Sequence, residues 1–310
     1  MSKTFLYLAM FIIMMIWGFN VIAIKVLVEF FDPITITAFR ILTAGSVVML
    51  LVIFNKELRK MNKQEWVYIF IASITGVFGH HLFLAVGLAH TSASNAGLIL
   101  GLVPLMTTLF ASLFLKDRLT INKLFGITLG FLGVLFIVLN GSGKLSAISK
   151  GDIYIFLSVI SQALSFIVIK IGTKTISSRL MTGTMFLIGS SFLFVSSFVL
   201  EPTGFSKLQL GTLGVWVVFI LSAVLATALG HSFYNKTIQH LGPGETAIFI
   251  NLTPFFSLVG AFIFLGEKIS PLQIIGFFFI LFGVLLGTGV LKINTSKWIT
   301  RKGTKQQMNC

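Results

Sequence analysis

The sequence has little cysteine and little charge. Its one cysteine, Cys310, is its last residue, which excludes an intrachain disulfide framework and a metal centre built from several cysteines. Only 10% of the 310 residues are charged, and nine of those residues are Asp or Glu. Soluble domains average about a quarter charged residues. A water-soluble globular protein is therefore excluded.

What the chain has instead is apolar residues in long runs. They make up 56% of the sequence, and the mean hydropathy is +0.99. Runs of about 20 apolar residues are typical of membrane spans. The first run, residues 5–24, is longer than the roughly 7–15 apolar residues of a signal peptide, and no A-x-A cleavage site follows it. The chain is predicted to be an integral membrane protein, all-α, with the lipid bilayer as its surroundings.

The apolar runs predict ten transmembrane helices, since each can cross about 30 Å of hydrocarbon at about 1.5 Å per residue. They lie near residues 4–24, 33–54, 66–89, 93–115, 122–140, 151–170, 180–200, 212–235, 243–265 and 271–290.

The net charge of +14 reflects Lys and Arg in short clusters between the runs. No basic helix or aromatic platform accompanies them, so a nucleic-acid partner is not expected. With ten spans, 17 of the 23 cations fall on the side that holds both ends of the chain and 5 on the other. The positive-inside rule then predicts a multi-pass protein of the cell membrane with cytoplasmic N- and C-termini, ending in a basic tail over 291–310.

The chain repeats itself at a shift of 150 residues, without a gap. The shift aligns His81 with His231, Pro104 with Pro254, and Gly133 with Gly283. Residues 4–140 and 151–290 would each hold five spans, and because five is odd, the second copy must enter the membrane from the opposite side. Inverted repeats of this kind are the architecture of many secondary transporters.

Three stretches resemble a known family. "LGEKIS" (265–270) with "IGFFFILFGVLL" (275–286) after Pro254, "IWGFNVIAIK" (16–25) and "AFRILTAG" (38–45) are similar to EamA-type members of the drug/metabolite transporter superfamily. The resemblance implies ten helices in two EamA domains, cytoplasmic ends, and commonly export of metabolites, amino acids or drugs. The first copy departs from the pattern, with Lys116-Asp117 where a Gly-Glu pair is more typical.

Ionisable groups inside a bilayer are expensive and are functional candidates by default. The nine acids all fall in loops or at span ends, which leaves histidine to titrate within the spans. His80, His81 and His231 are candidates for proton coupling, because imidazole titrates near physiological pH. Hydrogen bonding between helices is the alternative role. The inversion places His81 toward the outer half and His231 toward the inner half.

The other candidates for a substrate cavity are polar or aromatic residues in the spans. They are Trp17, Asn20, Asn95, Gln162, Asn235 and Asn251, with interhelical packing or hydrogen bonding as the alternative. Pro104 and Pro254 predict helix bends. Arg40 is expected either to extend to the external interface or to lie at the cavity mouth, where Asp32 or an anionic substrate could pair with it.

The pattern favours a secondary transporter, and an exporter, of a small metabolite, amino acid or drug-like compound, acting by alternating access. A membrane-embedded enzyme and a channel are the alternatives. The sequence has no H-E-x-x-H, no G-x-S-x-G and no P-loop, so no catalytic residue, metal or cofactor is expected. Substrate, direction, coupling ion, and the choice between monomer and homodimer stay open.

Overall fold

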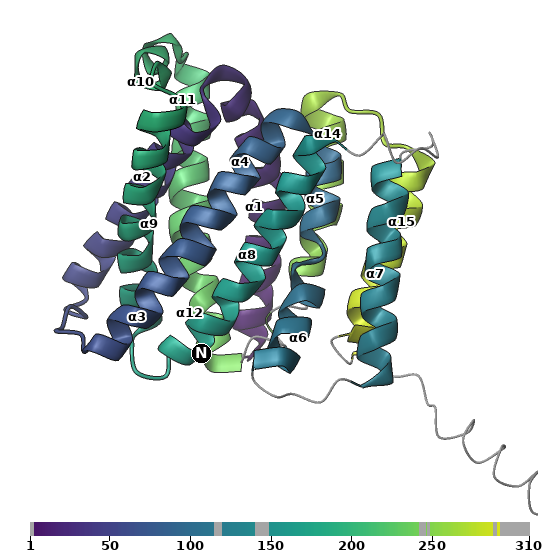
Figure 1. Ribbon diagram of the computed structural model, residues 1–310, viewed down its shortest axis with the longest axis horizontal. Helices are drawn as coiled ribbons and strands as arrows, with labels where there is room; N and C mark the ends of the chain where they lie inside the picture. The colour runs from purple at the N-terminus through teal and green to yellow at the C-terminus, as the bar shows by residue number, and fades with distance from the viewer. Residues whose placement is uncertain are drawn as a thin grey trace, which may run out of the picture.

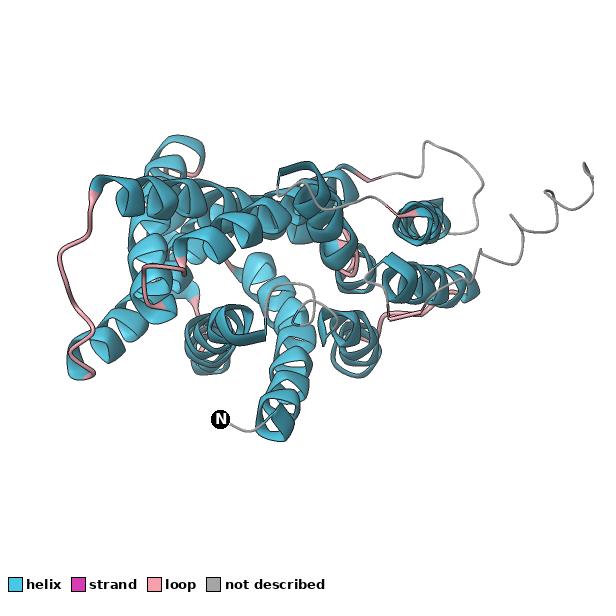
Figure 2. Cartoon of the chain, turned by 90° about the horizontal axis from the view of Figure 1, so that it is seen from below, coloured by secondary structure: helices cyan, strands magenta, loops and turns pink. Residues whose placement is uncertain are grey.

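The computed structural model describes residues 3–114, 120–139, 149–241, 246, 249–287 and 290–291. Within these ranges the chain forms helices and short connections and contains no strand (Figures 1 and 2). The helices are α1 Lys3–Phe30, α2 Pro33–Phe54, α3 Lys63–Ala72, η1 Ser73–Gly79, α4 His80–His90, α5 Ala93–Leu100, α6 Val103–Phe114, α7 Ile121–Leu139, α8 Lys150–Gly172, α9 Ser178–Leu200, α10 Gly204–Lys207, η3 Leu208–Leu210, α11 Leu213–Ile220, η4 Leu221–Gly230, α12 His231–Leu241, η5 Phe249–Asn251, α14 Leu252–Leu265 and α15 Pro271–Gly287.

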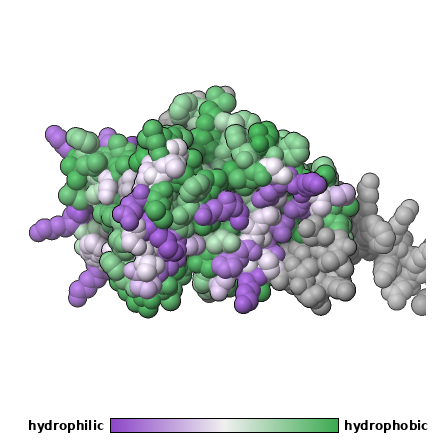
Figure 3. Space-filling model, turned by 90° about the horizontal axis from the view of Figure 1, so that it is seen from above, coloured by the Kyte–Doolittle hydropathy of each residue, from purple (hydrophilic) through white to green (hydrophobic). Residues whose placement is uncertain are grey.

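Helices of membrane-spanning length and composition dominate the described chain, which confirms the prediction of a multi-pass membrane protein. Seven qualify: Phe5–Phe30, Pro33–Phe54, Lys63–His90, Ala93–Phe114, Lys150–Gly172, Ser178–Leu200 and Leu213–His240. Three shorter apolar helices join them: Leu124–Ile137, Phe249–Leu265 and Pro271–Leu286. Large apolar side chains such as Phe114 and Phe264 are exposed, and Figure 3, which views the molecule from above, shows hydrophilic patches scattered among hydrophobic residues.

Side-chain caps explain where several helices begin. Asn62 and Glu65 form a reciprocal capping box at the start of α3, and Ser149 and Asp152 form another at the start of α8. Each box satisfies backbone N–H groups that have no partner inside the helix. Pro33 occupies the first position of α2, where a missing N–H does no harm. These starts divide the apolar sequence into separate helices.

Four of the expected spans are not continuous α-helices. The third contains the π-helical segment η1 between α3 and α4, and the eighth contains the π-helical segment η4 between α11 and α12. The fourth is interrupted by a turn at Gly101 and Leu102, just before Pro104. The span that holds Pro254 begins with the 3₁₀ turn η5. The prolines therefore follow irregular backbone and lie in the first turn of α6 and α14, where proline is tolerated.

Helices α7 and α15 pack side by side at one edge of the bundle (Figure 1). A Cβ added at Gly133 would lie 2.7 Å from the carbonyl oxygen of Gly276, and one added at Gly283 would lie 2.6 Å from that of Gly126. Residue numbers rise along one helix as they fall along the other, so the two helices run antiparallel. Only glycine leaves room for backbones this close.

Helices α2 and α9 also pack in antiparallel orientation. The carboxylate of Glu201, just after α9, accepts hydrogen bonds from the backbone N–H groups of Ile34 (2.9 Å) and Thr35 (2.7 Å) at the start of α2. At the other end, Glu57, just after α2, accepts a 2.8 Å bond from Ser177, the N-cap of α9, and pairs with Arg179. Each acid stabilises the positive end of a helix dipole.

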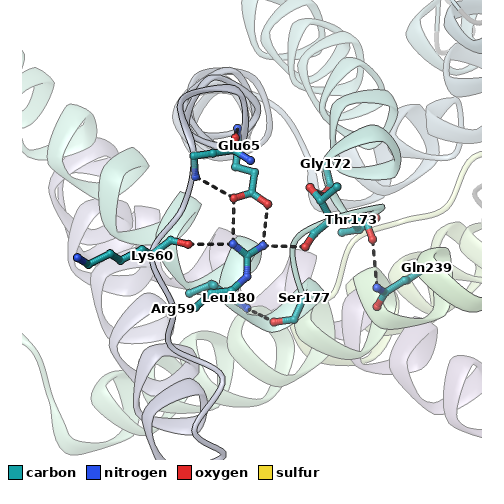
Figure 4. A network of polar contacts seen from close by, with 10 residues as sticks. Arg59, Lys60, Glu65, Gly172, Thr173, Ser177, Leu180 and Gln239 are labelled. Carbon is teal, nitrogen blue, oxygen red and sulfur yellow. Dashed lines mark hydrogen bonds and ion pairs between the residues drawn. The ribbon is translucent and has the colours of Figure 1, made fainter.

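The end of the bundle that holds Glu57 carries a second polar network (Figure 4). Arg59 makes two bonds to the carboxylate of Glu65 (2.7 and 3.0 Å) and donates to the carbonyl of Thr175 at 2.7 Å. Gln239 of α12 donates to the carbonyl of Thr173 at 3.1 Å. The network connects the segment after α2 and the start of α3 with the segment after α8.

The α7–α15 contact predicts that alanine destabilises the protein at Gly133 but not at Gly214. Gly133→Ala should lower the free energy of unfolding by about 1–3 kcal/mol, because the new methyl group meets a backbone carbonyl that cannot move aside easily. Gly214→Ala is the matched control, since the nearest atom to its Cβ is 4.0 Å away. The measurement is thermal unfolding of the purified protein in detergent. Equal midpoints of thermal unfolding for the two variants would contradict the close approach of α7 and α15.

Candidate functional site

A cavity lies in the middle of the bundle, with about 80 Å³ of space open to the centre of a water molecule. A single buried water needs roughly 10–15 Å³ by this measure, so a ligand of several non-hydrogen atoms can enter. The walls come from helices of both halves of the sequence. They are Trp17, Asn20, Val21 and Ile24 (α1), His80, His81 and Leu84 (α4), Leu100 and Val103 (α5 and α6), Gln162 and Phe166 (α8), His231 (α12), Ile250 (η5) and Thr253 (α14).

Three histidines meet at one wall of this cavity. The ring centres of His80 and His81 are 4.7 Å apart, and those of His81 and His231 are 5.8 Å apart. The indole of Trp17 lies against His231, with ring centres 4.7 Å apart. The prediction that His81 and His231 lie toward opposite halves of the membrane is therefore wrong, because their ring centres are only 5.8 Å apart, a small distance beside a hydrocarbon core of about 30 Å.

A π-helical segment precedes the histidines in each half. Segment η1 ends directly before His80, and η4 ends directly before His231. The two segments fall at matching positions under the 150-residue shift. π-Helical turns are rare and occur often at functional sites. They widen the helix locally and change the direction in which the following side chains point, here toward the cavity.

Arg40 is buried next to this cluster, at 1% exposure. Its guanidinium donates to the Thr227 hydroxyl at 2.8 Å and contacts Nδ1 of His81 at 3.3 Å. The prediction that Arg40 reaches the external interface or the cavity mouth is wrong, because α2 directs the side chain inward onto η4 and α4. Asp32, its predicted partner, pairs instead with Lys207 at 2.7 Å.

The hydrogen-bond partners assign protons on two of the rings. Because a guanidinium only donates, Nδ1 of His81 accepts from Arg40, and the neutral ring then carries its proton on Nε2. His231 contacts the carbonyl of Thr227 through Nδ1 at 3.1 Å, so that nitrogen carries the proton. The Trp17 indole donates to the carbonyl of Ala226 at 2.9 Å.

Two polar atoms of the cavity wall are buried without a hydrogen-bond partner among the described residues. They are Nε2 of His81 and Oε1 of Gln162. Leaving such an atom unsatisfied costs about 1–3 kcal/mol, and in native structures most buried polar atoms are paired. Both atoms belong to residues that line the cavity, where a ligand can provide the missing bond.

The other predicted residues occupy different places. Asn20 lines the cavity and accepts a 2.6 Å bond from Ser222. Asn95 lies in the first turn of α5 and accepts from Gln273 at 2.8 Å, while Asn235 is buried and donates to Thr182 at 2.8 Å. Asn251 is buried beside Ile250, and its amide atoms have no partner among the described residues. The structure thus brings six predicted residues to the cavity walls: Trp17, Asn20, His80, His81, Gln162 and His231.

Thr227 is the partner of Arg40 that sequence reasoning missed. It lies inside η4, where its hydroxyl accepts from Arg40 and donates to the carbonyl of Ser222 at 2.8 Å. A threonine in an apolar run gives no signal of such a role. Within the described residues, no three His, Cys, Asp or Glu side chains are grouped to hold a metal ion.

Comparison with known proteins gives one family. Residues 4–139 and 149–288 each match the EamA-like transporter family. The chain is similar to YyaM of Bacillus subtilis (strain 168), called an uncharacterized transporter, with 33% identity over 278 residues covering 87% of this chain and 88% of that one. A WAT1-related chloroplastic protein of Arabidopsis thaliana is 24% identical over 267 residues, covering 84% of this chain and 64% of the other.

A solved crystal structure shares the fold. It superposes with a TM-score of 0.68 at 16% identity, covering 93% of this chain and 98% of the other. At that identity the likeness shows the fold alone.

Two threonine-to-valine changes, at Thr227 and at Thr37, should have different effects on stability. Thr227→Val removes the acceptor of a buried cation and should lower the free energy of unfolding by about 1–3 kcal/mol. Thr37→Val, on α2, removes a buried hydroxyl without a partner among the described residues and should be neutral or stabilising. Thermal unfolding of both variants in detergent tests this, and a Thr227→Val protein as stable as the unmodified one would contradict the Arg40 contact.

Proposed function

The chain belongs to the EamA-like transporter family, and we propose that it is a secondary transporter that exports a small metabolite through the central cavity. Two five-helix halves of inverted orientation, residues 4–140 and 151–290, would expose this cavity to each side of the membrane in turn. One chain holds both halves, so a monomer is sufficient for transport.

The antiparallel packing of equivalent helices is the observation that carries this proposal. The 150-residue shift aligns α7 with α15, and α2 and α9 are the second helices of the two halves. In both pairs the partners run in opposite directions. That is what an inversion in the membrane plane requires, and inverted repeats with a binding site between them support alternating access.

The orientation of the chain rests on charge. The excess of Lys and Arg on one side supports cytoplasmic N- and C-termini in the cell membrane. The basic tail 291–310 lies outside the described residues, except for Leu291. An active alkaline phosphatase fused to the C-terminus would contradict this orientation, because that enzyme needs an oxidising compartment for its disulfides.

Export of a metabolite predicts a change in the growth medium. Overexpression of the gene should raise the concentration of at least one small metabolite outside the cell, and deletion should lower it, because a cavity of this size passes small molecules only. Metabolite profiling of medium from the two strains measures both changes. A variant with Leu84→Trp, which fills the cavity, should give the deletion profile. Unchanged medium in all strains would contradict export.

Proton coupling is proposed for the histidine cluster as a unit, because the ring centres of His81 and His231 are 5.8 Å apart, so that a proton gained by one ring affects the other. We expect the triple variant His80→Asn, His81→Asn, His231→Asn to lose flux driven by a pH gradient to a greater extent than exchange of the exported metabolite without a gradient. Asparagine keeps polarity but does not titrate. The measurement is transport in proteoliposomes with and without an imposed pH difference. Full gradient-driven accumulation by the variant would make the histidines structural.

A further inference from the structure

The buried charge of the bundle is unbalanced. Arg40 is fully ionised at any physiological pH, and no described carboxylate contacts its guanidinium. A buried charge without a partner is strongly unfavourable, and buried cations are normally paired. Its two contacts, the Thr227 hydroxyl and the His81 ring, are both neutral groups. Among the described residues, the Arg40 guanidinium therefore carries a buried positive charge without an anion beside it.

The described acids are all engaged elsewhere, at helix ends. Glu201 and Glu267 accept from backbone N–H groups at the starts of α2 and α5. The others pair with nearby groups: Glu29 with Lys25, Asp32 with Lys207, Glu57 with Arg179, Glu65 with Arg59, and Asp152 with Thr91. Each is held at its place by its own partner, so none of them is available to neutralise Arg40.

His81 connects this charge to the cavity. Its Nδ1 accepts from Arg40, which leaves Nε2–H as a donor that is buried and without a partner among the described residues, on a side chain that lines the cavity. An anion that accepts from Nε2 would lie one imidazole ring away from the guanidinium. Attraction between charges is strong at such a separation where water is excluded.

The rest of the wall suits a short organic anion. The Asn20 carbonyl accepts from Ser222, which leaves its amide group as a further donor at the cavity. Most of the remaining wall is apolar: Val21, Ile24, Leu84, Leu100, Val103, Phe166 and Ile250. A few donors in a largely hydrocarbon wall match a molecule with one carboxylate and a small apolar body.

We propose that the cavity binds small carboxylate anions, with His81 donating to the carboxylate and Arg40 supplying the countercharge behind it. This rests on the proposed transport function, since the anion would be the cargo. It names the chemical class of substrate and gives the uncompensated Arg40 a role as a specificity-determining residue.

The test is ligand-dependent thermal stability of the purified full-length protein in detergent at neutral pH. The probes are monocarboxylates from acetate to hexanoate and short 2-hydroxy acids, each compared with its neutral primary amide at matched ionic strength. A ligand that binds the folded state raises the unfolding midpoint. We expect at least one carboxylate to raise it and the corresponding amide to have no effect.

Variants of Arg40 test whether its positive charge, rather than the shape of the cavity, determines the affinity for carboxylates. Arg40→Gln should weaken the affinity for the carboxylate by roughly 10- to 100-fold, the range for loss of a charged partner, whereas Arg40→Lys should keep most of it. The control is Arg179→Gln, which removes a cation outside the cavity and should leave the affinity unchanged. If Arg40→Gln does not fold, His81→Phe tests the same site by removing the donor.

Three results would overturn the proposal: an amide that stabilises as well as its acid, no stabilisation by any carboxylate, or a folded Arg40→Gln protein with unchanged affinity. Measuring flux in proteoliposomes distinguishes failure of the proposed carboxylate site from failure of the proposed transport function. A carboxylate that binds but is not transported would refute the transport function alone. Transport of a neutral or cationic compound without any carboxylate binding would refute the carboxylate site and leave the transporter in place.

Discussion

The absence of water within a lipid bilayer is the constraint on which this structure depends. Every polar group at membrane depth needs a partner inside the protein. The described acids accordingly lie at helix ends, where Glu201 and Glu267 accept from backbone N–H groups. Within the described interior, Arg40 and three histidines are buried together beside the cavity. A cluster so costly to bury, beside the space that could hold a ligand, is difficult to explain by packing alone.

The duplicated sequence explains why the cluster has this form. The second copy repeats His81 as His231 and repeats the π-helical segment before it, so both halves contribute an imidazole to the same wall. Arg40 has no such counterpart: under the same shift it matches Ser190, which is uncharged. The site is therefore built from two similar halves but carries its charge on one of them. This asymmetry gives the cavity a preferred orientation for a ligand with a charged end.

Much of the fold followed from the sequence, because long apolar runs and their caps are local properties. The multi-pass membrane class and the family were both readable in this way. The histidines could be chosen as candidates, but their mutual distance could not. It depends on π-helical turns that no residue pattern announces, and Gly76 and Ala226 look like ordinary small residues of a span. The position of Arg40 was missed for a related reason: its partner Thr227 has no distinguishing sequence signal, so the general tendency of arginine to extend toward the membrane surface gave the wrong answer.

The central claim is that one cavity faces the two sides of the membrane in turn. Leu84 lines this cavity, and replacing Cys310 by serine removes the natural thiol, so Leu84→Cys in that background carries a single reporter. The decisive measurement is its modification by a membrane-impermeant thiol reagent, in intact cells and in inside-out vesicles. Alternating access predicts labelling from both sides, with no passage of the reagent through the protein. Labelling from one side only, under every condition of substrate supply, would contradict the account, and leakage of the reagent across the membrane would indicate a channel instead.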